Sequence, residues 1–71
     1  MFNRKLFSER VHELRVERGI SMKDLGAVVG LGRSSVNYWE LGDRSPSVEV
    51  LALLADYFEV SADYLMGRTD K

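Results

Sequence analysis

The feature that most constrains the fold is a short link, Gly30-Leu31-Gly32, between two segments with helical patterns. The first segment begins at Ser21, which together with Asp24 matches a capping box. The second runs from about residue 33 to residue 41 and stops before Gly42. The side chains expected to face the core are Leu25, Val28 and Val29 in the first segment and Val36 and Trp39 in the second. Two helices this short with so short a link predict a helix-turn-helix arrangement with a crossing near ~90–120°.

Three further helical segments are expected around this pair, because helices of two or three turns are marginal without packing. Phe7, Val11 and Leu14 form the stripe of a helix that ends at Gly19. The next stripe, after the N-cap Ser47, consists of Val48, Leu51, Ala55 and Phe58, and a last short helix follows Ser61 and ends at Gly67. The sequence therefore predicts an all-α fold, a compact five-helix bundle over residues 1–67, with a solvated tail at residues 68–71.

Composition excludes several classes of protein. The chain of 71 residues has no cysteine and one histidine, His12, so we expect neither a disulfide framework nor a metal site. It has no nucleophile beside a histidine, no paired carboxylates and no phosphate-binding loop after a strand, so we expect no enzyme, cofactor or small-molecule substrate. No apolar run suits a signal peptide or a membrane span, and a cytoplasmic location follows by elimination.

The charge distribution is uneven along the chain. The net charge is −1, which by itself does not favour a nucleic-acid partner. Residues 1–19 carry five basic and three acidic side chains, whereas residues 48–71 carry two basic and five acidic ones. Because a partner meets one face and not the total charge, the basic N-terminal part leaves DNA binding open.

The segment of residues 33–41 carries polar side chains away from its core face, with chemistry suited to reading DNA. They are Arg33, Ser34, Ser35, Asn37 and Tyr38. Arginine can bridge guanine O6 and N7, asparagine can bridge adenine N6 and N7, and serine can pair with either base. The alternative interpretation is an ordinary solvated helix face.

Residues on either side of this segment are candidates for phosphate contacts. The N-terminus of the preceding helix offers unpaired amides, to which Ser21 and Lys23 add donors, and Arg44 lies in the following loop. The alternative is that Ser21 only caps its helix and that Lys23 and Arg44 only keep the domain soluble. At the edge of the core face Glu40 needs a partner, and we expect Arg15 to form a bidentate ion pair with it.

Beyond these local patterns, the chain resembles the Cro/C1-type helix-turn-helix family, also called the xenobiotic-response-element (XRE) family. The resemblance covers about residues 7–67 and is carried by the runs 19–26, 29–42, 44–47 and 60–67. It implies a five-helix, lambda-repressor-like domain that binds operator DNA as a homodimer. It also implies base or nearby backbone contacts for Arg33, Ser34, Ser35, Asn37 and Tyr38, phosphate contacts for Ser21, Met22 and Arg44, and a salt bridge between Arg15 and Glu40.

This chain departs from the family pattern at several of these positions. Met22 replaces the usual glutamine, which removes a side-chain hydrogen bond to DNA. Gly32 replaces the usual serine or threonine cap, and Gly26 replaces alanine at a close helix crossing. Leu41 and Asp43 replace the usual asparagine and lysine, so a donor is lost and an anion is placed near the expected phosphates.

The sequence thus predicts a sequence-specific DNA-binding transcriptional regulator, a repressor, that dimerises on double-stranded operator DNA. The last helix is apolar, and Tyr64, Leu65 or Met66 is expected near the two-fold axis of the homodimer. The alternative is a protein-binding module on the same fold, an adaptor or an antitoxin with little DNA affinity. A third possibility is that the chain is the DNA-binding part of a longer regulator.

Overall fold

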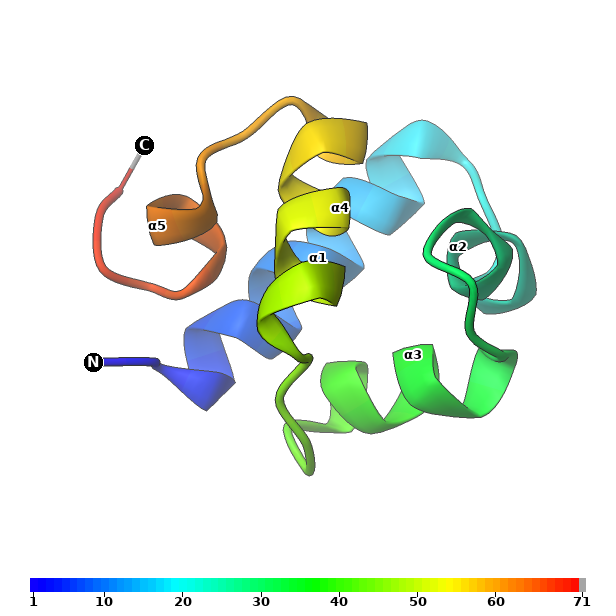
Figure 1. Cartoon of the computed structure of the whole chain (residues 1–71), viewed down its shortest axis with the longest axis horizontal. Helices are drawn as coiled ribbons and strands as arrows, with labels where there is room; N and C mark the ends of the chain where they lie inside the picture. Colours follow the sequence, from blue (N-terminus) through cyan, green and yellow to red (C-terminus); the bar gives the residue numbers. More distant parts are fainter. Residues whose placement is uncertain (71) are drawn as a thin grey trace.

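The computed structural model describes residues 1–70, and within them it contains five helices and no strand. The helices are α1 (Arg4–Arg18), α2 (Met22–Val28), α3 (Arg33–Leu41), α4 (Val48–Phe58) and α5 (Ala62–Leu65). In Figure 1, α4 crosses in front of α1, while α2 and α3 lie on the side of the molecule opposite α5. The predicted all-α, five-helix fold is confirmed.

Side-chain and glycine caps set the helix ends. The side chains of Asn3, Ser21, Ser47 and Ser61 each accept a hydrogen bond from the backbone N–H three residues later, at the starts of α1, α2, α4 and α5. Gly19 and Gly42 adopt the left-handed conformation that closes α1 and α3. These caps confirm the helix boundaries that the sequence predicts around Ser21, Ser47 and Ser61.

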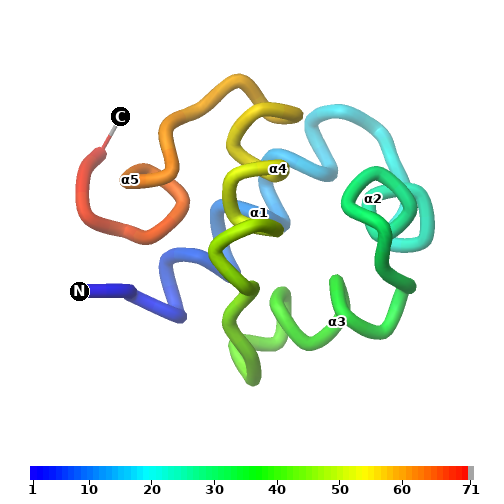
Figure 2. The backbone as a smooth tube through the Cα atoms, in the orientation of Figure 1, coloured from blue at the N-terminus to red at the C-terminus, as the bar shows by residue number. Residues whose placement is uncertain are grey.

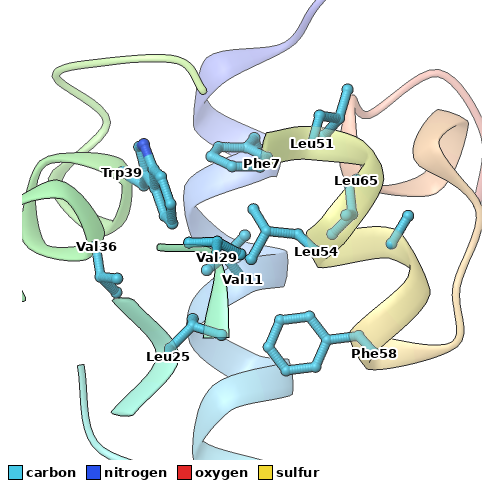
Figure 3. Packing of buried hydrophobic residues seen from close by; sticks show 11 residues of the cluster. Phe7, Val11, Leu25, Val29, Val36, Trp39, Leu51, Leu54, Phe58 and Leu65 are labelled. Atoms are coloured by element: carbon cyan, nitrogen blue, oxygen red, sulfur yellow. The ribbon is translucent and has the colours of Figure 1, made fainter. Parts of the chain in front are cut away.

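The core lies between α1, α3 and α4. Figure 3 shows its side chains converging from the five helices and from Val29, the residue that follows α2. The rings of Phe7 on α1 and Trp39 on α3 pack in a T-shaped pair with 6.2 Å between their centroids. Leu54 on α4 and Leu65 on α5 are fully buried. The buried hydrophobic residues of the core are Phe7, Val11, Leu25, Val29, Val36, Trp39, Leu51, Leu54, Ala55, Phe58 and Leu65.

Two residues expected in the core are exposed instead. Val28 is 42% exposed, because it lies about 100° around α2 from Val29 and about 120° from Met22, at the edge of the face that packs on the core. Val48 is 80% exposed. It is the first residue of α4, and since helical side chains lean toward the N-terminus, its side chain extends beyond the core layer that Leu51 reaches.

The two ends of the domain meet beside α5. The N–H of Asn3 donates to the carbonyl of Met66 at 2.8 Å, and Figure 2 shows the N-terminus next to α5. Arg10 on α1 donates to the carbonyls of Tyr64 (2.6 Å) and Thr69 (2.7 Å). Residues 68–70 of the predicted tail are therefore exposed but attached to α1, and Lys71 lies outside the described residues.

The expectation that Leu65 lies at a dimer axis is wrong for this fold. Leu65 has no exposed surface, because α5 turns it inward against α4 and α1. Its neighbours Tyr64 and Met66 are half-buried. The Arg10 guanidinium lies 4.2 Å from the Tyr64 ring centroid and covers one face of that ring. Only Tyr64 and Met66 of the three candidates have surface available to a second copy.

Candidate nucleic-acid interface

The turn between α2 and α3 holds α3 very close to α2. The N–H of Leu31 donates to the carbonyl of Gly26 at 2.8 Å. A Cβ atom on Gly26 would lie 2.7 Å from the Gly32 oxygen and 2.8 Å from its carbonyl carbon. Both of these atoms belong to the backbone, so no side chain can swing away to make room. The absence of a side chain at Gly26 therefore sets the distance at which α3 crosses α2.

The five predicted base-reading residues all lie on α3, with unequal exposure. Arg33 and Ser34 are exposed in its first turn, and Tyr38 is 38% exposed one turn later. Ser35 and Asn37 are half-buried. The buried side of α3 consists of Val36 and Trp39. The helix thus presents its N-terminal half as a polar surface with one cation.

The candidate phosphate-binding residues lie at the start of α2 and in the loop after α3. The Ser21 hydroxyl accepts from the Asp24 N–H at 3.0 Å, and Lys23 is exposed in the same turn. The Met22 side chain packs against the core, so its backbone amide is the group that this residue can offer to a phosphate. The Arg44 guanidinium carbon lies 4.4 Å from the centroid of the Tyr38 ring.

Arg4 also lies beside the loop that follows α3, although no local sequence pattern predicts that it does. Arg4, at the start of α1, is exposed, and its Nη1 atom lies 3.4 Å from the Asp43 carbonyl oxygen. The two residues are far apart along the chain, so only the packing of α1 against α3 brings them together. Arg4 adds a positive charge at the point where Asp43 introduces a negative one.

The ion pair expected between Arg15 and Glu40 is present and bidentate. Arg15 Nε lies 2.6 Å from Glu40 Oε2, and Arg15 Nη2 lies 3.1 Å from Oε1. The side chains are 14% and 6% exposed, and Arg15 Nη1 also donates to the Ile20 carbonyl at 2.9 Å. The pair therefore joins α3 to the C-terminal half of α1, and Arg15 also binds the backbone at Ile20, just before the N-cap of α2.

His12 also binds Glu40, a contact that the sequence analysis did not predict. His12 Nδ1 lies 2.7 Å from Glu40 Oε1. The signal was available, because His12 precedes Arg15 by three residues and so shares its face of α1. Burial of the Glu40 carboxyl opposes its ionisation, but the hydrogen bonds and charges of Arg15 and His12 outweigh this and hold its pKa below the usual value. The hydrogen bond to Glu40 raises the pKa of Arg15.

Two other kinds of site are not found in the described part of the chain. Residues 1–70 contain no group of three or more histidine, cysteine, aspartate or glutamate side chains that could hold a metal ion. None of the five helices in this range has the length and apolar character that a membrane span requires.

The chain is similar to known helix-turn-helix proteins. The model of a family described as helix-turn-helix matches residues 11–65. The chain is 38% identical over 60 residues to the HTH-type transcriptional regulator AnsR of Bacillus subtilis, covering 84% of this chain and 52% of AnsR. It is 31% identical over 65 residues to the cryptic phage CTXphi transcriptional repressor RstR of Vibrio cholerae, covering 92% of this chain and 59% of RstR.

Solved structures agree with these relatives. The P22 c2 repressor in complex with synthetic operator 9T superposes with a TM-score of 0.85 and 30% identity, covering 90% of this chain and 97% of the repressor chain. The restriction-modification controller protein C.AhdI of Aeromonas hydrophila gives a TM-score of 0.76 and 32% identity, with coverages of 87% and 90%. The chain spans between half and three fifths of AnsR and RstR. It belongs to the XRE-type helix-turn-helix family of DNA-binding transcriptional regulators, and its fold is that of the P22 repressor DNA-binding domain.

Proposed function

We propose that this domain binds a specific double-stranded DNA operator by inserting α3 into the major groove, and that it represses transcription there. The observation that carries the proposal is the exposed polar N-terminal half of α3, with Arg33 and Ser34 outermost. Side chains in this part of a recognition helix are the ones that reach base edges. Asn37 and Ser35 lie deeper on the same helix and would read bases once the helix has entered the groove. As a regulator of operator DNA the domain would work in the cytoplasm.

In this proposal, residues outside α3 contact the phosphate backbone and orient the helix. Ser21, Lys23 and the Met22 amide lie at the start of α2, where helix amides and the helix dipole favour an anion. Arg44 lies in the loop that follows the C-terminal end of α3. Contacts of this kind fix the register of a protein on DNA without reading its sequence.

Repression is the finer part of the proposal. It is supported by the names of two relatives, the RstR and P22 c2 repressors, whereas the relative BcrR of Enterococcus faecalis is described as an activator. A promoter–reporter assay with the selected operator placed over the promoter tests it. Reduced reporter output on expression of the protein is expected, and increased output would contradict repression.

A second candidate function is that of a protein-binding module, such as an adaptor or an antitoxin, on the same fold. The observation that favours it is the exposed apolar side chain of Leu41, 63% accessible, at the end of α3. Asp43 beside it is exposed and anionic. An apolar residue followed by an anion is less suited to phosphate oxygens than to a protein surface. In this case the domain would show little affinity for any DNA duplex.

The first prediction separates these functions by the way single variants change DNA preference. Asn37→Ala is expected to weaken binding to the best selected operator by about 1–3 kcal/mol and to relax preference at one or two base pairs. Arg44→Ala is expected to weaken binding to all duplexes about equally and to reduce the salt slope by about one unit. The measurement is a set of binding isotherms on the operator and on scrambled DNA at several salt concentrations. If Asn37→Ala and Arg33→Ala both leave the base preferences intact, α3 is not the reading helix.

The second prediction concerns stoichiometry. We propose a symmetric homodimer on DNA with Tyr64 and Met66 close to the two-fold axis, since Tyr64 in α5 and Met66 at its end are both half-buried and keep some exposed surface. Sedimentation of the protein with its saturated operator is expected to show two protein chains per duplex. Met66→Asp is expected to reduce the apparent affinity for a two-half-site operator far more than for a single half-site. One chain per duplex at saturation would overturn the dimer.

A further inference from the structure

An open groove of about 370 Å³ lies between α3 and the loop that leads to α4. Its polar lining consists of Ser34, Ser35, Tyr38, Arg44, Ser45 and Ser47. Trp39, the only tryptophan of the chain, also lines it. The groove is thus bordered by the proposed reading helix on one side and by the start of α4 on the other.

Arg44 is held in this groove by an aromatic ring and not by a carboxylate. Its guanidinium carbon lies 4.4 Å from the Tyr38 ring centroid, a distance suited to stacking. Within residues 1–70 Arg44 makes no ion pair, whereas Arg15 and Arg18 pair with Glu40 and Glu59. A guanidinium stacked on a ring keeps its N–H edge free, and this edge matches two oxygens of a phosphate.

Other polar groups of the groove can also bind an anion, while Leu31, Pro46 and Val50 give the remaining lining an apolar character. Serine hydroxyls on both walls can donate hydrogen bonds to phosphate oxygens. Ser47 is the N-cap of α4, so the positive end of this helix of 11 residues adjoins the groove. A cation with a free edge, several hydroxyls and a helix N-terminus therefore line one open cavity of sufficient size for a phosphate group.

We propose that Tyr38 is the positioning residue for Arg44 at the phosphate contact proposed above, and that the groove beside α3 is where the two side chains meet the DNA backbone. The ring of Tyr38 holds the guanidinium flat, so that its N–H edge is ready to meet two phosphate oxygens when the duplex arrives. Tyr38 then contributes to affinity for every sequence and not to base reading. This inference rests on the proposed function and deepens it.

The experiment is a double-mutant cycle on DNA affinity with Tyr38→Ala, Arg44→Ala and the double variant, measured on the selected operator at several salt concentrations. Arg44→Ala is expected to weaken binding about tenfold and to lower the salt slope by about one unit. Tyr38→Ala alone is expected to weaken binding about three- to tenfold on operator and scrambled DNA alike. The double variant is expected to bind no more weakly than Arg44→Ala, because each change removes the same contact. Tyr38→Phe keeps the ring and is expected to rescue most of the affinity that Tyr38→Ala loses.

Arg18→Ala is the matched control. Arg18 also stacks on rings, those of Tyr57 and Phe58, and its loss removes the same charge at a place remote from the groove. Additive losses in the cycle, or a Tyr38→Phe loss as large as that of Tyr38→Ala, would overturn the positioning role while leaving DNA binding intact. If the unaltered protein binds no duplex, the proposed function falls together with this inference.

Inorganic phosphate distinguishes a phosphodiester site from a site for the free ion. Titration at constant ionic strength, followed by Trp39 fluorescence, is expected to show no saturable change with phosphate and a clear change with operator DNA. Saturation by phosphate at millimolar concentration that Arg44→Ala removes would instead assign the groove to the free anion, against the proposal.

Discussion

Replacing Gly26 with valine is expected to lower the free energy of unfolding by at least about 3 kcal/mol. The first added carbon would already lie 2.7 Å from the Gly32 oxygen, and 3.1 Å from the Leu31 oxygen. Relief requires the backbone of the turn to move, and with it α3. Gly26→Ala is expected to destabilise less, because alanine's better helix propensity recovers about 1 kcal/mol. Equilibrium denaturation in urea measures both changes.

Gly32→Ala is the matched control for this prediction. A Cβ atom on Gly32 meets nothing within 4 Å, and the residue does not adopt a positive φ. Its replacement is expected to change stability by less than about 1 kcal/mol. If Gly26→Val were as stable as the unaltered protein, the close crossing of α2 and α3 would not be a constraint on the fold.

Glu40→Ala is expected to destabilise the domain by about 3 kcal/mol, since it leaves the largely buried Arg15 guanidinium without its carboxylate. Arg15→Ala leaves Glu40 with His12 alone. The double variant is expected to be less destabilised than the sum of the two single changes, with a coupling of at least about 1 kcal/mol. Simple additivity in denaturant titrations would show that the pair does not join α3 to α1 energetically.

The same pair predicts how stability depends on pH. The folded-state pKa of Glu40 lies below its value in an unfolded chain, which is about 4.3. Its stabilising contribution is therefore fully present above the unfolded value and is lost as the pH falls through the folded-state pKa. Glu40→Gln is expected to flatten the acid limb of the stability curve. Glu13→Gln, at an exposed position of α1, is the control and is expected to leave that limb unchanged.

Much of the fold could be predicted from the sequence because its determinants are local. The positions of Ser21, Ser47 and Ser61 predict helix starts, since a serine side chain reaches an amide only three residues away. Periodic apolar residues predict the faces of α1 and α3, and Val36 and Trp39 are buried as expected. The periodic pattern wrongly predicted that Val28 and Val48 are buried. Both residues stand at helix ends, where the neighbouring element decides how far a side chain is covered.

The candidate site divides in the same way. The sequence itself determined which polar side chains share a face of α3, because the helical repeat places them there, and it indicated the Arg15–Glu40 pair. Only the tertiary structure decided the contacts that join distant segments: Arg4 at the Asp43 carbonyl, Arg44 on the Tyr38 ring, and Leu65 inside the core. It also decided how close Gly26 comes to Gly32. Local patterns fix the direction of a side chain relative to its own helix, but the neighbour it meets depends on how separate helices pack, which no short stretch of sequence encodes.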